Sequence, residues 1–307
     1  KTKVINDLNF QSLDLLTDYG FKNNYNIYMK NLNTTAKNDA QYKSSPQVEL
    51  MSIFYFNSSL PMINETENSI NYLTPKVSFR FNPGDMKNYS DTDRKISVSN
   101  IFDINRLGID DSFEEGKSLT MGLDFKKANI LNINKFFEAK LATVYREKDR
   151  DFIPSSSGID KENSNFFGSL SNNFSDFLNV SYDFIIDNDL NTLKYNSLST
   201  TLNYKNLTTE FNFIEESGQF GNANTLENKT KLKFNEDNYL TFNTRRNRKI
   251  NLTEYYDLIY EYKNDCLVAG IKYNKTYYED RDLKPSENLL FTITLSPITS
   301  FEQKVDK

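Results

Sequence analysis

The chain contains no histidine and no tryptophan, and it has a single cysteine among its 307 residues. Without histidine, the commonest general base is missing, together with Ser-His and Cys-His nucleophile pairs and most kinds of zinc site. One cysteine cannot form a disulfide within the chain. These absences argue against an enzyme, and we expect no catalytic residue, no metal site and no cofactor.

Long apolar runs and a basic excess are missing as well. No window approaches the run of roughly 18 apolar residues that a transmembrane helix needs, and the mean hydropathy is -0.66. A helical membrane protein is therefore excluded, whereas a membrane β-barrel is not, because only every second residue of its strands must be apolar. The net charge of -5 argues against a nucleic-acid partner, since that surface needs a concentrated basic excess.

What the chain does have is aromatic residues in strict alternation. Phenylalanine and tyrosine make up 14% of the sequence, a composition that suits strands and interfacial girdles. Near the C-terminal end, three runs place apolar side chains at every second position, which is the signature of a strand. The three rows are Tyr256, Leu258, Tyr260 and Tyr262; Leu267, Ala269, Ile271 and Tyr273; and Leu289, Phe291, Ile293 and Leu295.

The connections between these runs differ in length. Only Lys263–Asp265 separates the first two, whereas the charged segment Lys275–Glu287 separates the second two. Tight turns at one end and long polar loops at the other are the rhythm of an outer-membrane barrel. The alternation is regular from residue 116 onward, and it predicts about 15–16 strands in the whole chain.

Alternation alone does not separate a membrane barrel from a soluble β-sandwich, because two stacked sheets give the same pattern. Strand length and the rhythm of the connections favour the barrel. We therefore predict an all-β fold, the antiparallel transmembrane β-barrel, forming one domain over residues 1–307 and part of a larger barrel. Val48–Phe56 is apolar at both parities, so this strand either packs against protein on its inner side or is misassigned.

Several short segments occur in an order that resembles the LptD family of lipopolysaccharide-assembly proteins. They are Leu73–Pro75, Pro83, Asn105–Asp110, Pro154–Gly158, Asn264–Cys266, Lys272-Tyr273, Asp280–Pro285 and Leu290–Leu295. Each segment is weak alone, and their order carries the resemblance, which spans essentially the whole chain. The family usually follows the last residue of Asn105–Asp110 with a basic residue, and Asp111 departs from that pattern.

The resemblance implies a non-enzymatic translocon of the cell outer membrane that inserts lipopolysaccharide into the outer leaflet. The glycan would pass through the barrel lumen while the acyl chains leave through a lateral gate. The partners would be lipopolysaccharide, a lipoprotein plug (LptE-like) and a periplasmic bridge protein (LptA-like). The family's N-terminal periplasmic domain and first barrel strands would lie outside these residues. A general porin-like channel is the first alternative, and an outer-membrane hydrolase and a soluble Asn-rich adhesin are the others.

Two sites follow from the resemblance. Cys266 takes the position at which the family forms disulfides with cysteines of its N-terminal domain. The last clear strand would be the lateral gate, and it would need a pairing partner from outside this chain. Its residues are Asn288, Leu289, Leu290, Phe291, Thr292, Ile293, Thr294 and Leu295.

A basic strip is the remaining candidate site. Four basic side chains share the inward parity of two neighbouring strands, namely Lys229, Lys231, Lys233 and Arg245. In the lumen they would meet the phosphates and carboxylates of lipid A and the inner-core sugars. Alternatively, they are balanced in a hydrated lumen by inward acidic residues, namely Asp183, Glu210 and Asp257.

The barrel also predicts how the two faces tolerate charge. Arginine at an outward position, Leu123 or Val180, should cost roughly 2–4 kcal/mol near the bilayer midplane. Arginine at an inward position, Thr120 or Ser181, should cost much less.

Overall fold

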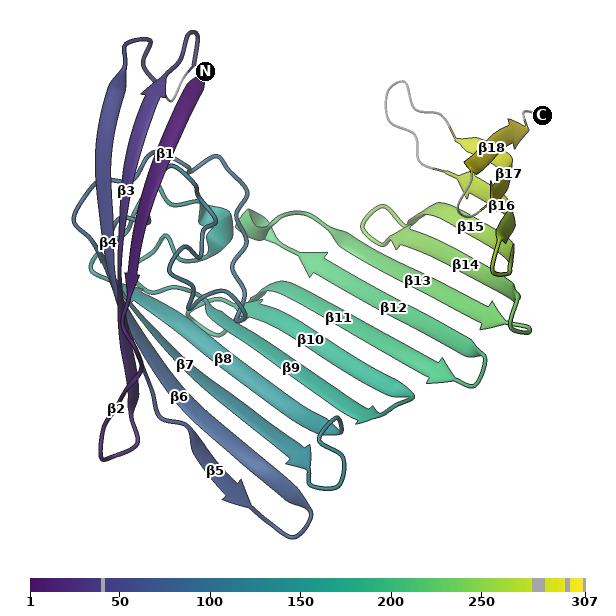
Figure 1. The fold of residues 1–307 in the computed structure, drawn as a ribbon, viewed down its shortest axis with the longest axis horizontal. Helices are drawn as coiled ribbons and strands as arrows, with labels where there is room; N and C mark the ends of the chain where they lie inside the picture. The colour runs from purple at the N-terminus through teal and green to yellow at the C-terminus, as the bar shows by residue number, and fades with distance from the viewer. Residues whose placement is uncertain (40–41, 278–284, 296–298, 306–307) are drawn as a thin grey trace. The chain divides into compact units, whose positions relative to one another are not determined.

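The computed structural model describes residues 1–39, 42–277, 285–295 and 299–305. They form antiparallel strands and two single-turn 3-10 helices, η1 (Ser155–Ser157) and η2 (Gly218–Phe220) (Figure 1). None of the helices in the described residues is long and apolar enough to cross a membrane. The segment Asp280–Pro285 of the family resemblance lies outside the described residues except for its last residue.

Eighteen strands are present in the described residues, more than the 15–16 expected, partly because two are very short. The first nine are β1 (Thr2–Gln11), β2 (Leu15–Leu16), β3 (Lys22–Thr35), β4 (Gln47–Ser59), β5 (Met62–Glu65), β6 (Ser69–Asn82), β7 (Gly116–Asn129), β8 (Phe136–Arg146) and β9 (Phe166–Ser175). The others are β10 (Leu178–Ile186), β11 (Leu193–Tyr204), β12 (Leu207–Glu216), β13 (Asn224–Lys233), β14 (Asn238–Asn247), β15 (Leu252–Lys263), β16 (Leu267–Thr276), β17 (Ser286–Leu295) and β18 (Thr299–Val305).

The chain divides into two compact units, and the boundary falls within β9, β10 and β11. Unit 1 is Lys1–Leu170, Asp183–Tyr195 and Ser217–Gly221, and unit 2 is Ser171–Tyr182, Asn196–Glu216 and Asn222–Lys307. Each unit is described by itself below. The expectation of one domain over residues 1–307 stays a prediction.

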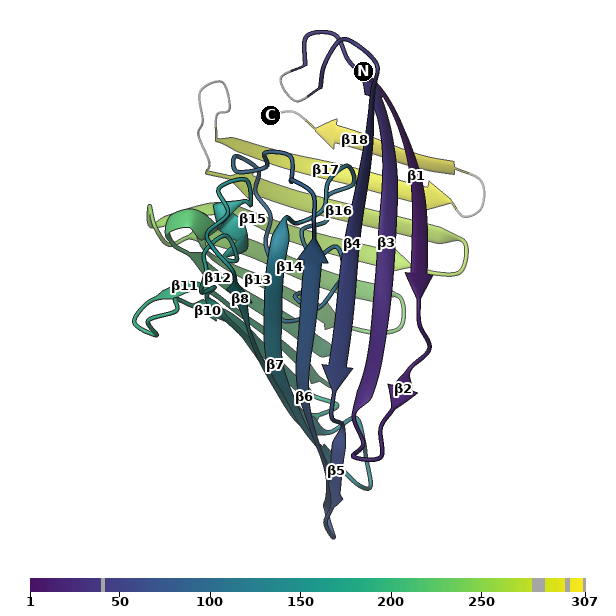
Figure 2. The same cartoon turned by 90° about the vertical axis from the view of Figure 1, so that its left-hand side faces the viewer.

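In unit 1 the strands pair in an antiparallel meander. Strand β3 pairs with β1 and β2 on one side and with β4 on the other, and β4, β6, β7 and β8 follow in order. Figure 2 shows β1, β3, β4, β6 and β7 side by side. The connection 130–135 at one end is short, whereas 83–115 and 147–165 at the other end are long. This is the expected rhythm of tight turns and long loops.

Two prolines lie where β6 changes its pairing partner from β4 to β5. Pro61 separates β4 from β5, and both strands pair with β6 on the same side. Pro75 of β6 lies opposite this break, where the missing N–H has no ladder partner to lose. Its carbonyl still accepts a hydrogen bond of 3.0 Å from the backbone of Leu60. Strand β6 therefore continues through a proline that would normally end a central strand.

The two faces of the unit 1 sheet have opposite character. On β7 the outer face carries Leu119, Met121 and Leu123, and Leu123 is 43% exposed. The inner face of the same strand carries Ser118 and Thr120, which are fully buried or nearly so. A soluble domain buries its apolar face, because that burial drives folding. Here the apolar face is the exposed one, which excludes the soluble sandwich and fits a surface that meets lipid.

A hydrophobic core nevertheless exists, and it lies on the inner face. Segments 83–115 and 147–165 pack against inner side chains of the strands, including Val144 of β8 and Phe167 of β9. The same holds for β4, where Ile53 and Tyr55 are buried while Phe54 is exposed. The expectation that this strand packs against protein on its inner side is confirmed.

Unit 2 is a simple meander in which β12 to β18 pair consecutively. Strand β18 corrects one expectation, because it pairs with β17 from Leu289↔Val305 to Leu295↔Thr299. Asn288–Leu295 is therefore flanked by β16 and β18 of this chain and is not an edge that needs an outside partner. The sequence pattern did not predict β18, because after Leu295 apolar residues no longer recur at every second position.

Candidate functional site

Four neighbouring strands of unit 1 carry a row of inner side chains, and this row leaves space for a buried charged site. Tyr55, Arg80, Ser118 and Arg146 lie opposite one another on β4, β6, β7 and β8. Neighbouring strands are about 4.8 Å apart, so the two arginines are separated by roughly 10 Å. Ser118 between them is small, and the gap above it admits side chains from the long segment 83–115.

Glu114 and Arg106 of that segment fill the gap. The Arg106 guanidinium donates to both carboxylate oxygens of Glu114, through Nε at 2.7 Å and Nη2 at 2.5 Å. It also donates to Thr120 Oγ1 at 2.9 Å and to Ser118 Oγ at 3.1 Å. A bidentate arginine–carboxylate pair has a fixed geometry, so it holds the segment in one position on the strands.

Arg80 and Arg146 complete a cluster of three arginines around one glutamate, which we call the Glu114 cluster. Arg146 donates to Glu114 Oε1, and Arg80 Nη1 lies 4.0 Å from Oε2. Burial raises the pKa of Glu114, but the three arginines, Arg106 first, outweigh it and hold this pKa well below its usual range. The carboxylate is therefore ionised, and the four side chains sum to a charge of +2.

The family-like segment Asn105–Asp110 builds the turn that presents Arg106. Asn105 closes the turn with its side chain, which donates to the Ile109 carbonyl at 2.9 Å and accepts from the Ile109 N–H at 3.2 Å. Gly108 has a φ of +62°, a conformation that side-chain-bearing residues rarely adopt. Leu107 and Ile109 enter the hydrophobic core. The segment thus anchors the loop on the inner face.

Asp111 replaces the basic residue that the family pattern carries. Its carboxylate accepts a hydrogen bond from the Tyr89 hydroxyl and lies 3.7 Å from Lys3 Nζ of β1. Asp111 is thus paired with a cation of β1 rather than carrying a positive charge itself. It fastens segment 83–115 to the first strand.

Hydrogen bonds of backbone and hydroxyl groups hold segment 147–165 on the inner face beside the Glu114 cluster. Arg146 donates through Nε to the Ile159 carbonyl, and Ser157 donates to the Pro154 carbonyl at 2.5 Å. Gly158 has a φ of +71°, and a Cβ there would lie 2.7 Å from the Phe220 ring. The family-like segment Pro154–Gly158 is a tight turn that only glycine can end here.

The basic strip lies in unit 2, and the pairing of β13 with β14 puts its four residues on one face of the sheet. Opposite pairs are Lys229 with Asn243, Lys231 with Thr241, and Glu227 with Arg245. Arg245 is neutralised, since it lies 3.4 Å from Glu227 and 2.9 Å from Glu254. Lys229 and Lys231 are exposed.

The acidic residues proposed to balance the strip are distributed unevenly. Glu210 of β12 lies directly opposite Lys229. Asp257 is engaged elsewhere, by Lys272 at 3.2 Å and by the side chain of Asn274. Asp183 belongs to unit 1. Whether the strip contacts lipopolysaccharide stays a prediction.

Cys266 lies in the tight turn between β15 and β16. The Asn264 side chain accepts from the Cys266 N–H at 3.0 Å and from the Leu267 N–H at 2.8 Å, which fixes the turn. The thiol is free and exposed. It is accessible to a partner, but its pairing in a longer protein stays a prediction, as does the gate role of Asn288–Leu295.

The sequence pattern singled out none of the four side chains of the Glu114 cluster. One signal was available: Arg80 and Arg146 stand at the ends of their strands, next to the two longest connections of the described chain. Charges at that place can pair with a loop that folds back over the sheet.

A family model supports the resemblance directly. The model of LptD, described as LPS transport system D, matches residues 12–216, which is about two thirds of the chain. The chain belongs to the LptD family. Membership places it in the outer membrane as part of a transmembrane β-barrel, in agreement with the exposed apolar face of its strands. The match includes all four LptD-like segments between residues 73 and 158.

The comparison with solved structures matches two siderophore receptors and a porin, among others. The ferric enterobactin receptor PfeA of Pseudomonas aeruginosa, in a mutant form, is 9% identical with a TM-score of 0.45, covering 99% of this chain and 56% of the receptor. The siderophore receptor PirA of Acinetobacter baumannii is 10% identical with a TM-score of 0.44, covering 96% and 56%. A triple mutant of the Rhodopseudomonas blastica porin is 9% identical with a TM-score of 0.36, covering 93% of each chain.

The LptD-family chain therefore spans about half the length of the two siderophore receptors. The comparison with curated proteins gave no match.

Proposed function

We propose that this chain forms part of the passage through which lipopolysaccharide crosses the outer membrane to the outer leaflet. The glycan moves along the polar inner face, and the acyl chains leave sideways into lipid at the barrel seam. The chain acts by shape and solvation and catalyses no covalent step. The observation that supports this best, beside family membership, is the contrast between the faces, with an exposed apolar row outside and hydrogen-bonding side chains inside.

The inner face of unit 2 suits a sugar chain. Its side chains carry amide, hydroxyl and carboxylate groups, and they include Asn212, Glu210, Asn243, Asp257, Asn274 and Thr292. Such groups exchange hydrogen bonds with hydroxyl-rich molecules and with water at similar strength, so a glycan can move past them without being trapped. Lys229 and Lys231 add positive charge that attracts phosphate groups.

The two units differ in how much of the inner face is already covered. The buried apolar side chains in the described residues all belong to unit 1, where segments 83–115 and 147–165 fold inward. Unit 2 has none. We propose that a lipoprotein plug resembling LptE covers inner surface in unit 2, and that a periplasmic bridge protein resembling LptA delivers the substrate.

Site-specific photo-crosslinking in cells that express the full-length protein tests the proposal. A photoreactive amino acid replaces Asn243 on the inner face, and the matched control places it at Phe242, the adjacent outward residue of β14. Capture of lipopolysaccharide at residue 243 that depends on ongoing transport would support the passage. Equal capture at both positions, or none at residue 243, would contradict it.

The alternative is a general porin-like channel. It predicts steady ion conductance by the purified full-length protein in planar bilayers, together with no capture of lipopolysaccharide at residue 243.

A further inference from the structure

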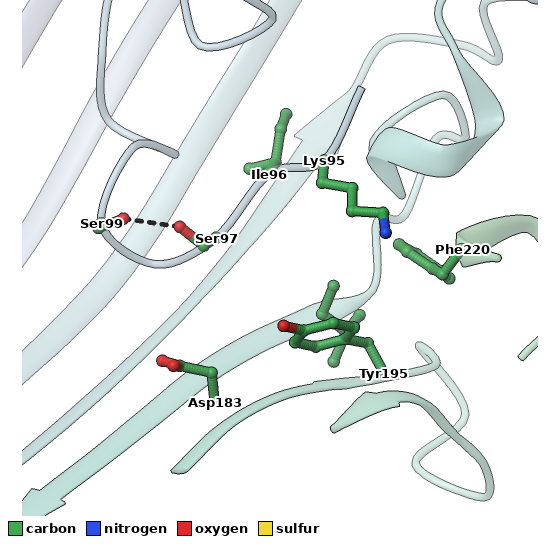
Figure 3. Close-up of a pocket in the computed structure, with 8 residues that line it drawn as sticks. Lys95, Ile96, Ser97, Ser99, Asp183, Tyr195 and Phe220 are labelled. Carbon is green, nitrogen blue, oxygen red and sulfur yellow. Dashed lines mark hydrogen bonds between the residues drawn. The ribbon is translucent and has the colours of Figure 1, made fainter. Parts of the chain in front are cut away.

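Unit 1 contains a pocket that has no part in the transport function as it is proposed above. Its volume is about 270 Å³, and it is lined by Lys95, Ser97 and Ser99 of segment 83–115, Asp183 of β10, Tyr195 of β11 and Phe220 of η2 (Figure 3). Four separate parts of unit 1 meet here. The pocket is small beside the sites of drug-sized ligands, which begin at roughly 300 Å³.

The pocket has an apolar floor and a polar rim. Phe220 is 1% exposed, and Ile96 and Ile185 beside it are also buried. The rim consists of the exposed side chains of Lys95, Ser97, Ser99 and Asp183. In Figure 3 the Lys95 ammonium extends toward the Phe220 ring, and the Tyr195 hydroxyl points to the side of the pocket that carries Asp183.

The serine side of the rim is preorganised. Ser97 Oγ and Ser99 Oγ are hydrogen-bonded at 2.7 Å, and the Ser97 N–H donates to the Asn100 side chain at 2.9 Å. The Ser97 carbonyl accepts from the Ile101 N–H at 3.0 Å, which closes the turn. A ligand that binds these hydroxyl groups would therefore order little additional chain, and this lowers the entropy cost of binding.

Asp183 offers unused hydrogen-bonding capacity. Its side chain makes no hydrogen bond or ion pair with any residue that the structure describes. An ionised carboxylate accepts through two oxygens, and bonds to a charged acceptor are stronger than neutral ones. Two adjacent hydroxyl groups of a ligand can satisfy both oxygens at once.

We propose that this pocket binds one pyranose ring of the lipopolysaccharide glycan, and this rests on the proposed transport function. A pyranose has an apolar C–H face and a rim of hydroxyl groups, which matches an aromatic floor and a rim of carboxylate and hydroxyl side chains. An acyl chain matches less well, because it offers no hydrogen-bond donor to the Asp183 carboxylate. The pocket holds the glycan on the inner side of unit 1 as it passes.

Ligand-observed NMR with the purified full-length protein in detergent tests the pocket. The probe is the deacylated glycan released from lipopolysaccharide of the same cells, observed by saturation transfer to its ring protons. The variants Asp183→Asn and Tyr195→Leu alter the pocket, and Asp189→Asn removes the same charge from the turn after β10 as a control. Thermal unfolding followed by circular dichroism verifies that each variant is folded.

We expect the glycan to bind the parent protein and Asp189→Asn equally, and to bind each pocket variant about tenfold more weakly, as for loss of one charge-assisted hydrogen bond or of the aromatic wall. Equal binding by all four proteins, or binding by none, overturns the pocket. Delivery of lipopolysaccharide to the cell surface is measured separately. Delivery without glycan binding would reject the pocket alone, whereas pocket-dependent binding by a protein that never delivers would reject the transport function.

Discussion

Replacing Glu114 by glutamine should release the inward-folded segment 83–115 while leaving the strands of the barrel paired. Glu114 is the only carboxylate in the Glu114 cluster, which contains Arg80, Arg106 and Arg146, and each of these four side chains is at most 4% exposed. Glutamine keeps the shape but removes the charge that compensates the arginines. Breaking a buried ion pair from one side costs roughly 3–5 kcal/mol, because the remaining charges stay buried without compensation.

The control is Glu147→Gln. Glu147 lies 3.7 Å from Lys117, and both side chains are more than half exposed. Such exposed pairs contribute about 0–1 kcal/mol. The two substitutions are chemically identical, so their difference isolates the effect of burial.

The assay is limited proteolysis of the folded full-length protein, combined with a urea titration of the barrel. We expect Glu114→Gln to expose 83–115 to cleavage at protease concentrations that leave Glu147→Gln intact. Because the folded pKa of Glu114 lies well below the usual value of about 4.3, its contribution is fully present above pH ~4.3 and is lost only as pH falls through the lower folded pKa. The parent protein should therefore stay protected at pH 5. Equal protection of both variants would refute the reasoning.

Three further predictions concern the two faces and the turn cysteine. Arginine at Val180 on the outer face should lower the free energy of unfolding in a urea titration by roughly 2–4 kcal/mol, and arginine at the neighbouring Ser181 much less; equal losses would contradict the facial assignment. Alanine at residue 122 would place its Cβ 2.7 Å from the Phe102 ring and 3.2 Å from a backbone carbonyl. Gly122→Ala should therefore lower the free energy of unfolding by about 1–3 kcal/mol in the same titration. An unchanged midpoint would mean that Phe102 does not pack against Gly122. For Cys266, non-reducing gels of the full-length protein should show a mobility shift that Cys266→Ser abolishes, and a shift-free gel would mean a free thiol.

The strands were predictable because every second residue is constrained by lipid. The alternation at Leu119–Leu123 and the apolar row of β15 both place the outer face correctly, since no loop or partner interferes with that face. The inner face obeys no such rule. Thr120 was expected to tolerate arginine, but it is fully buried and accepts a hydrogen bond from Arg106 at 2.9 Å. Arginine at residue 120 would therefore replace a buried, hydrogen-bonded side chain, and the small loss of stability expected for this substitution no longer follows.

Side-chain contacts between residues far apart in the sequence could not be predicted from the local alternation of apolar and polar residues. Glu114 and Arg146 are far apart in sequence, and only the register of β6, β7 and β8 brings their surroundings together. The resemblance to LptD singled out Asn105–Asp110, but it gave no indication that this segment presents Arg106 to Glu114. Strand β18 was missed because the positions that pair with the apolar row of β17 alternate between apolar and polar residues, namely Thr299, Phe301, Gln303 and Val305.

In this structure the exposed apolar face of the strands meets lipid and the opposite face does not. Fluorescence quenching by lipids brominated in their acyl chains tests this directly, since these 307 residues contain no tryptophan of their own. Single tryptophans replace Phe211 on the outer face and Asn212 on the inner face of β12, in a full-length protein whose other tryptophans are changed to phenylalanine. We expect strong quenching at residue 211 and none at residue 212. Equal quenching at both residues would contradict the account.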